Sequence, residues 1–323
     1  MNILKKINVK HRKILSRIIL FLIVFAIVTS AALFYFRGQI ADKESLKTSE
    51  GAEVRLLEYL SGTFPRSGFP EPNMPGAALL LFPIYKITGG SLVFFWIVKL
   101  WHILSLTLAI LILYKIIRSL ALSLLLLAYP FTHVFSYHTC FDLLLIVGAL
   151  YLLFQKRVRC FYLLSLIFPL FRLELILFPI ILIFVRKDYR WLWVPFASFL
   201  AFLTANYYFY GDPFWYFTVN IAGFHHNFGT TGLVATIAGA IVAVITLFFY
   251  LKDAIISFFH IIFQKPHKNA WLSLFAVSSS LVFLYFLLVK HSSSMDRFGF
   301  YLLPFIILKL DTIIPCALKK EIP

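Results

Sequence analysis

Long apolar stretches alternate with short polar segments along almost the whole chain. The apolar stretches are continuous and do not alternate residue by residue, which is typical of membrane helices and not of barrel strands. We therefore expect an all-α polytopic membrane protein, with about ten transmembrane or half-inserted helices in one integral-membrane domain, residues 1–323. The expected full spans are residues 18–36, 92–114, 121–135, 140–154, 191–209, 233–251, 270–289 and 298–314.

Two apolar segments near the middle, residues 161–170 and 173–185, are shorter than the others. A span needs about 20 residues to cross a hydrocarbon core of ~30 Å. We expect a helix pair that enters from the inner side, bends near Pro169 and returns. The bend would put Arg172 and Glu174 in the outer half of the membrane, where an ionisable side chain is a functional candidate. An Arg172–Glu174 ion pair that only stabilises the bend is the alternative.

The main polar stretch, residues 37–76, follows the first apolar run and is acidic. Glu50 and Glu53 are three residues apart, so they share one face if this part is helical. A carboxylate facing a cavity can act as a general base and take the proton of an attacking hydroxyl. A solvated acidic face of an amphipathic helix is the alternative. Residues 77–87 are flanked by proline and glycine, which predicts a short interfacial helix.

Composition agrees with a membrane protein and excludes a soluble one. The chain is 61% hydrophobic and 14% charged, with a mean hydropathy of +0.89, so it has too few polar side chains for a soluble surface. The net charge of +16 comes from short basic clusters between apolar runs, as the positive-inside rule predicts, so we expect no nucleic-acid partner. The three cysteines are far apart in sequence and show no metal-ligand or redox spacing, so we interpret them as packing residues.

The basic residues also predict which ends of the helices face the cytoplasm. With the N-terminus inside, twenty of the thirty Lys and Arg residues fall on the inner side and eight on the outer side. We therefore expect cytoplasmic N- and C-termini, with residues 37–76 as the first extracytoplasmic loop. The first apolar run is too long for the core of a cleaved signal peptide, so we interpret it as an uncleaved anchor.

Three basic residues on the predicted outer side, Arg172, Lys290 and Arg297, are candidates for binding an anion. A guanidinium can bind phosphate oxygens with two hydrogen bonds and neutralise charge that develops on a leaving group. For Arg297, a membrane-boundary cation paired with Asp296 is the alternative. The histidine spacings fit no compact zinc site, so we expect no metal site. We expect substrate contacts from the polar residues of the same side, His133, His138, Asp212, His225 and His226.

Several short motifs occur in a characteristic order along the chain. They are Ser49-Glu50-Gly-Ala-Glu53, Pro72-Asn-Met-Pro75, Phe171-Arg172-Leu-Glu174, Tyr210-Gly211-Asp212-Pro213, and Asp296-Arg297 through Pro304. Together they resemble the GT-C superfamily of polytopic membrane glycosyltransferases, in particular its protein-mannosyltransferase-like and aminoarabinose-transferase-like branch. Glutamate stands in the first loop where that family usually has aspartate.

The resemblance implies an inverting transferase of the cell envelope. Its donor would be a polyprenyl-phosphate-linked sugar, and its acceptor a lipid, glycan or protein on the outer side of the membrane. By position, the base would be Glu50, with Glu53 second, and the donor phosphate would be bound by Arg297 and Arg172. Members of the superfamily differ in whether they use a divalent cation, so the resemblance leaves open whether this protein uses one as a cofactor. A flippase or transporter for a lipid-linked sugar, and a non-catalytic scaffold of the same fold, are the alternatives.

Overall fold

A computed structural model of the chain describes residues 2–36, 75–89, 91–128, 139–215, 230–263, 270–290 and 296–313. All regular structure within these ranges is helical, which confirms the all-α fold class. The α-helices are α1 (Asn2–Phe36), α4 (Pro75–Thr88), α5 (Leu92–Ile117), α6 (Leu120–Leu124), α7 (Thr139–Phe154), α8 (Val158–Ser165), α9 (Phe168–Phe171), α10 (Leu177–Arg186), α11 (Trp193–Tyr210), α13 (Thr230–Phe263), α14 (Ala270–Lys290) and α15 (Asp296–Ile313). Three short 3₁₀ helices join them, η2 (Leu125–Ala128), η3 (Leu173–Ile176) and η4 (Tyr189–Trp191).

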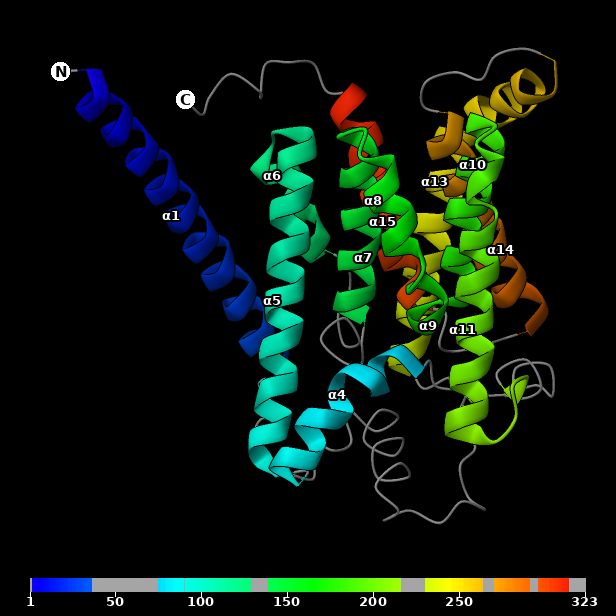
Figure 1. Ribbon diagram of the computed structural model, residues 1–323, viewed down its shortest axis with the longest axis horizontal. Helices are drawn as coiled ribbons and strands as arrows, with labels where there is room; N and C mark the ends of the chain where they lie inside the picture. The colour runs from blue at the N-terminus through cyan, green and yellow to red at the C-terminus, as the bar shows by residue number, and fades with distance from the viewer. Residues whose placement is uncertain are drawn as a thin grey trace.

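The long helices stand beside one another in a bundle, and α4 lies across its lower end (Figure 1). In the described ranges, four segments are long and apolar enough to cross a membrane, His11–Phe34, Leu92–Ile117, Tyr189–Tyr210 and Ile237–Ile261. They support an integral, multi-pass membrane protein. The expectation of about ten spans is corrected, because several of the other apolar segments form helices that are shorter than a bilayer requires.

The segment at residues 121–135 illustrates the correction. Ser119 caps α6, since its side-chain oxygen accepts a hydrogen bond from the Leu122 amide at 3.3 Å. This helix ends at Leu124 and continues only as the 3₁₀ turn η2, and residues 129–138 lie outside the described ranges. The continuous apolar sequence therefore predicted a long helix where the described backbone forms less than three turns.

The expected break in the middle of the chain is confirmed. Helices α8 and α9 lead down to Arg172, which is extended (φ −150°, ψ 113°), and η3 and α10 lead back up (Figure 1). Pro169 occupies the first turn of α9, where its missing amide hydrogen costs no helical hydrogen bond. The chain thus turns back at Arg172, between α9 and η3.

The core is formed mainly by α5, α7, α13, α14 and α15. Helix α5 packs on α7, α13 packs on α14 and α15, and α15 also contacts α7, which joins the two sets. Helix α1 leans against this group through α5. Its buried residues, Val24, Val28 and Ala32, recur every four positions and form one narrow stripe. Much of its remaining surface is apolar and exposed, as expected of a helix that contacts lipid.

Candidate functional site

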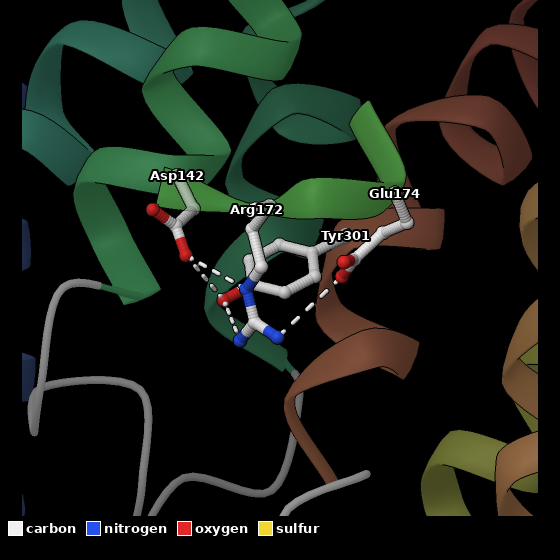
Figure 2. A network of polar contacts seen from close by, with 4 residues as sticks. All are labelled: Asp142, Arg172, Glu174 and Tyr301. Carbon is white, nitrogen blue, oxygen red and sulfur yellow. Dashed lines mark hydrogen bonds and ion pairs between the residues drawn. The ribbon is translucent and has the colours of Figure 1, made fainter. Parts of the chain in front are cut away.

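A buried polar network surrounds the side chain of Arg172 at the turn between α9 and η3 (Figure 2). Its Nε lies 3.0 Å from Oδ2 of Asp142, and its Nη2 donates a hydrogen bond to the Tyr301 hydroxyl at 2.9 Å. The Arg172 side chain is 10% exposed and that of Asp142 is fully buried. Two ionised groups removed from water in this way stabilise one another only when they are paired and hydrogen-bonded.

Tyr301 closes the network into a triangle. Its hydroxyl donates to the same Asp142 oxygen at 3.0 Å, and its ring centroid lies 4.8 Å from the Arg172 guanidinium carbon. One tyrosine therefore provides a hydrogen-bond donor, an acceptor and a cation–π surface. The three residues come from the first turn of α7, the bend before η3 and the beginning of α15, so the triangle joins three elements that are far apart in sequence.

Glu174 is a second, weaker partner of Arg172. Its Oε1 lies 3.5 Å from Nη1, and its side chain is 20% exposed. The predicted Arg172–Glu174 contact is therefore present, but Asp142 is the closer and more buried partner. With both carboxylates ionised, they exceed the single guanidinium by one negative charge. The positive charge of Arg172 is thus largely balanced by the protein itself.

Helix α4 packs directly against the bend that carries Arg172. Pro75 and Gly76 are buried, and a Cβ on Gly76 would come within 2.8 Å of the Leu170 carbonyl oxygen and 2.9 Å of the Phe171 ring. Glycine fits this close approach, because a Cβ would meet the Leu170 backbone and one of the two elements would have to shift. The helix that follows the predicted acidic loop is thereby held against the residue that precedes Arg172.

A small cavity of about 20 Å³ lies beside the network and is lined by Arg172, Glu174, Ser279 and Tyr301 among others. That volume is enough for about one water molecule with several polar neighbours. Among the residues that the structure describes, no three His, Cys, Asp or Glu side chains are grouped to hold a metal ion.

No family model, curated protein or solved structure matches this chain. The resemblance to the GT-C superfamily therefore stays a prediction that rests on the short motifs, and the function has to be argued from the chemistry of the site.

Most of the sequence-predicted site residues lie outside the described ranges, namely Glu50, Glu53, His133, His138, His225 and His226. Lys290 is the last residue of α14 and Arg297 the second of α15, and only their backbones are described. Arg297 precedes Tyr301 by four residues, so its backbone lies one turn away on the same face of α15. The structure thus brings Arg172 and the beginning of α15 together.

Asp212 has a local structural role in the described part of the chain. Its Oδ1 accepts a hydrogen bond from the Phe214 amide at 2.8 Å. The preceding Gly211 ends α11 with φ +76°, a left-handed conformation that glycine adopts without strain. This aspartate stabilises the turn after α11, and its predicted contact with substrate stays a prediction.

Asp142 and Tyr301 were not among the site residues predicted from the sequence. Asp142 is the one Asp, Glu, Lys or Arg residue within the apolar run 140–154, and a charge in such a run is costly unless it is paired. That signal could have identified it. Its partners could not be read from the sequence, because they lie 30 and 159 positions away along the chain.

Proposed function

We propose that this protein is a membrane glycosyltransferase that moves a sugar from a polyprenyl-phosphate donor to an acceptor hydroxyl on the outer side of the membrane. The observation that carries the proposal is the packing of Gly76 on Leu170 and Phe171. It joins the helix that follows the acidic stretch to the bend that carries the buried Arg172. An acid and a phosphate-binding cation have to act at one site in such a reaction, and this contact supports a common site.

In the proposed reaction, Glu50 or Glu53 takes the proton of the acceptor hydroxyl as that oxygen attacks the anomeric carbon. The bond from this carbon to the phosphate oxygen breaks, and both of its electrons leave with the polyprenyl phosphate. Attack from the face opposite the leaving group inverts the anomeric configuration. Cations beside the leaving oxygen stabilise the developing charge.

The charge balance of the network indicates which of the three cations binds the donor phosphate. Asp142 and Glu174 already balance the charge of Arg172, so its attraction for a further anion is reduced. We therefore assign the main phosphate contact to Arg297, and a second contact to Lys290, the last residue of α14. Arg172 acts as a positioning residue that holds the first turns of α15 through Tyr301.

The test uses the full-length protein in detergent with labelled polyprenyl-phosphate hexoses and aminopentoses as donors. Replacing the general base, by Glu50→Gln or Glu53→Gln, is expected to lower sugar transfer by about 100-fold or more. Glu44→Gln is the matched control, because it removes an acid from the same polar stretch and is expected to leave transfer unchanged. Full transfer by both the Glu50 and Glu53 variants would overturn the assignment of the base.

Arg297→Lys tests whether positive charge alone is enough to bind the donor phosphate, or whether the planar guanidinium is needed. Lysine keeps the positive charge but loses the planar pair of hydrogen-bond donors, so kcat/KM is expected to fall by about tenfold or more. A flippase is distinguished in proteoliposomes, where it would translocate the labelled lipid without transferring its sugar. A scaffold would do neither.

A further inference from the structure

The side chain of Asn206 is a buried polar group that the proposed reaction does not use. It lies in the second half of α11 and is fully buried. Neither its Nδ2 nor its Oδ1 has a hydrogen-bond partner in the part of the chain that the structure describes. Most buried polar side chains in proteins are hydrogen-bonded, because an orphaned one lowers stability. The amide at this position therefore needs an explanation other than stability.

Asn206 is at the end of the bundle that holds the Arg172 bend. It belongs to the buried stripe of α11, together with Ser198, Phe202 and Phe209. Helix α11 packs on α8, α9 and α4. Helices α8 and α11 both run from the top to the bottom of the bundle in Figure 1, so the second half of α11 lies beside α9 and α4.

Trp215 has a second unpaired polar group at this end of α11. Its indole Nε1 is buried and has no hydrogen-bond partner among the described residues. Its ring stacks on that of Tyr210, with centroids 5.7 Å apart and an angle of 16° between the planes. Tyr210 follows Asn206 by four residues, so the two side chains leave the same face of the helix one turn apart. We call Asn206, Tyr210 and Trp215 the α11 cluster.

Asp212 holds Trp215 in this position. Its Oδ1 accepts a hydrogen bond from the Phe214 amide at 2.8 Å, and its backbone carbonyl accepts one from the Trp215 amide at 3.2 Å. These two bonds form the short turn that follows Gly211 at the end of α11. The indole ring is therefore placed beside Tyr210 by a defined local turn.

The α11 cluster has the groups that recognise a sugar ring. A primary amide offers two N–H donors and a carbonyl acceptor, and adjacent sugar hydroxyls can both donate to it and accept from it. An indole offers one more N–H donor beside a large apolar face, on which the C–H bonds of a sugar can pack. The three side chains are uncharged, and Asp212 beside them is already hydrogen-bonded to a backbone amide. An uncharged polyhydroxyl group fits such a cluster better than an ion does.

An aromatic belt at the membrane boundary is the simpler interpretation of the stacked rings. It explains why Tyr210 and Trp215 are aromatic, but it does not explain two polar groups that are left unpaired in the interior. The orphaned amide and indole N–H therefore distinguish a binding site from a belt.

We propose that Asn206 and Trp215 bind hydroxyl groups of a pyranose ring and so select the sugar of the transfer reaction. This inference rests on the proposed function, because it adds the sugar-recognising part of the same site. Both groups are closed off from solvent, so the end of α11 has to open for the sugar to enter and then closes on it. The pyranose is carried either by the lipid phosphate or by the acceptor, and the probes below distinguish the two sources.

The experiment measures the binding of radiolabelled decyl-phosphate hexoses and aminopentoses to the full-length protein in a polyoxyethylene detergent, which has no sugar head group. Decyl methyl phosphate is the reference, because it is a phosphodiester with the same chain and charge but without a ring. We expect at least one sugar probe to bind about tenfold more tightly than the reference. Monodeoxy analogues of that probe should lose most of this gain at one or two positions. Equal binding of the reference and all sugar probes would overturn the proposal.

Neutral decyl glycosides of the same sugars identify the source of the ring. A sugar-dependent gain that appears only with the phosphate-linked probes assigns the cluster to the donor sugar. A gain of similar size with the neutral glycosides assigns it to the acceptor. Each result supports the shared chemistry, provided that the gain depends on Asn206.

Asn206→Leu separates a ligand-binding amide from a structural one. Leucine has a similar size and leaves no orphaned polar atom, so the protein without ligand should unfold at the same temperature as the wild type or higher. The gain in binding from the sugar should fall to less than about twofold, with the reference probe unaffected. A structural amide predicts the reverse, a lower unfolding temperature with the sugar gain retained, and that result would overturn the proposal.

Two further variants complete the test. Trp215→Phe keeps a ring against Tyr210 and removes only the indole N–H, so the sugar gain should fall by about fivefold. Ser198→Ala is the matched control, because Ser198 shares the buried stripe but its hydroxyl already donates to the Pro195 carbonyl at 3.0 Å. It should leave the sugar gain unchanged. If Asn206→Leu does not fold, an unchanged gain in Trp215→Phe contradicts the site.

Binding is measured apart from transfer, so the two proposals can fail separately. Sugar-dependent binding that requires Asn206, in a protein that transfers no sugar, would keep this site and remove the proposed activity. Sugar transfer together with an unchanged sugar gain in Asn206→Leu would keep the activity and remove this site.

Discussion

At the scale of single residues, Asp142 is the side chain whose loss should be most costly. It is fully buried and neutralises Arg172, whose side chain is 10% exposed. Asp142→Asn keeps the shape but leaves a buried guanidinium without its closest carboxylate. We expect the free energy of unfolding to fall by about 3 kcal/mol, measured by reversible denaturant unfolding in micelles.

The double variant Asp142→Leu with Arg172→Met tests the same argument from the other direction. Removing both charges should cost less than Asp142→Leu alone, because no buried guanidinium is left without its closest carboxylate, and only Glu174, whose side chain is 20% exposed, loses its ion-pair partner. As a control, Asp188→Asn disrupts a pair whose arginine side chain is 70% exposed, and it should change stability by no more than about 1 kcal/mol. A single Asp142 variant as stable as this control would show that the network contributes little.

At the scale of elements, the position of α4 depends on Gly76. Gly76→Ala puts a methyl group within 2.8 Å of the Leu170 carbonyl, so either α4 or the bend at Arg172 has to shift. We expect a loss of about 1–3 kcal/mol in the free energy of unfolding, the usual cost of overpacking. The same variant should lower sugar transfer if the proposed site depends on this contact.

Gly148 in α7 provides the matched substitution. A Cβ at this position has no described neighbour within 4 Å, and its backbone is helical. Gly148→Ala should therefore be neutral or stabilising by up to about 1 kcal/mol, because alanine favours helix more than glycine does. If both variants change stability by the same amount, the close contact at Gly76 is not what requires glycine.

At the scale of the whole molecule, the sides of the membrane can be tested across one span. Tyr189 and Phe214 are exposed and flank α11, whose 18 residues extend about 27 Å along the axis. Cysteines are introduced singly at these positions after Cys140, Cys160 and Cys316 are replaced by alanine. An impermeant thiol reagent added outside intact cells should label Phe214→Cys and leave Tyr189→Cys unlabelled, because Arg186, Lys187 and Arg190 predict an inner side for Tyr189.

Permeabilised cells give the control for this labelling. Both cysteines should react once the reagent reaches the cytoplasm. Labelling of Tyr189→Cys in intact cells, with Phe214→Cys protected, would reverse the predicted orientation. Labelling of both would show that α11 does not cross the membrane between them.

Much of the fold class and of the central bend follows from local sequence. Continuous apolar runs require internally hydrogen-bonded helices in lipid, so the all-α fold and the membrane location could be predicted. The two short runs around Arg172 are each too small to span, so the turn in the bundle could be predicted as well. The number of full spans could not be predicted in this way. The hydropathy of residues 121–135 does not reveal that the helix tightens into η2 after Leu124.

The sequence by itself determined that Arg172 is an ionisable residue at a helix break in an apolar environment. Only the tertiary structure decided its partners. Asp142 and Tyr301 reach it from α7 and α15, and Gly76 brings α4 against its neighbour Phe171. Periodicity and hydropathy act over a few helical turns, whereas these contacts depend on how separate helices pack.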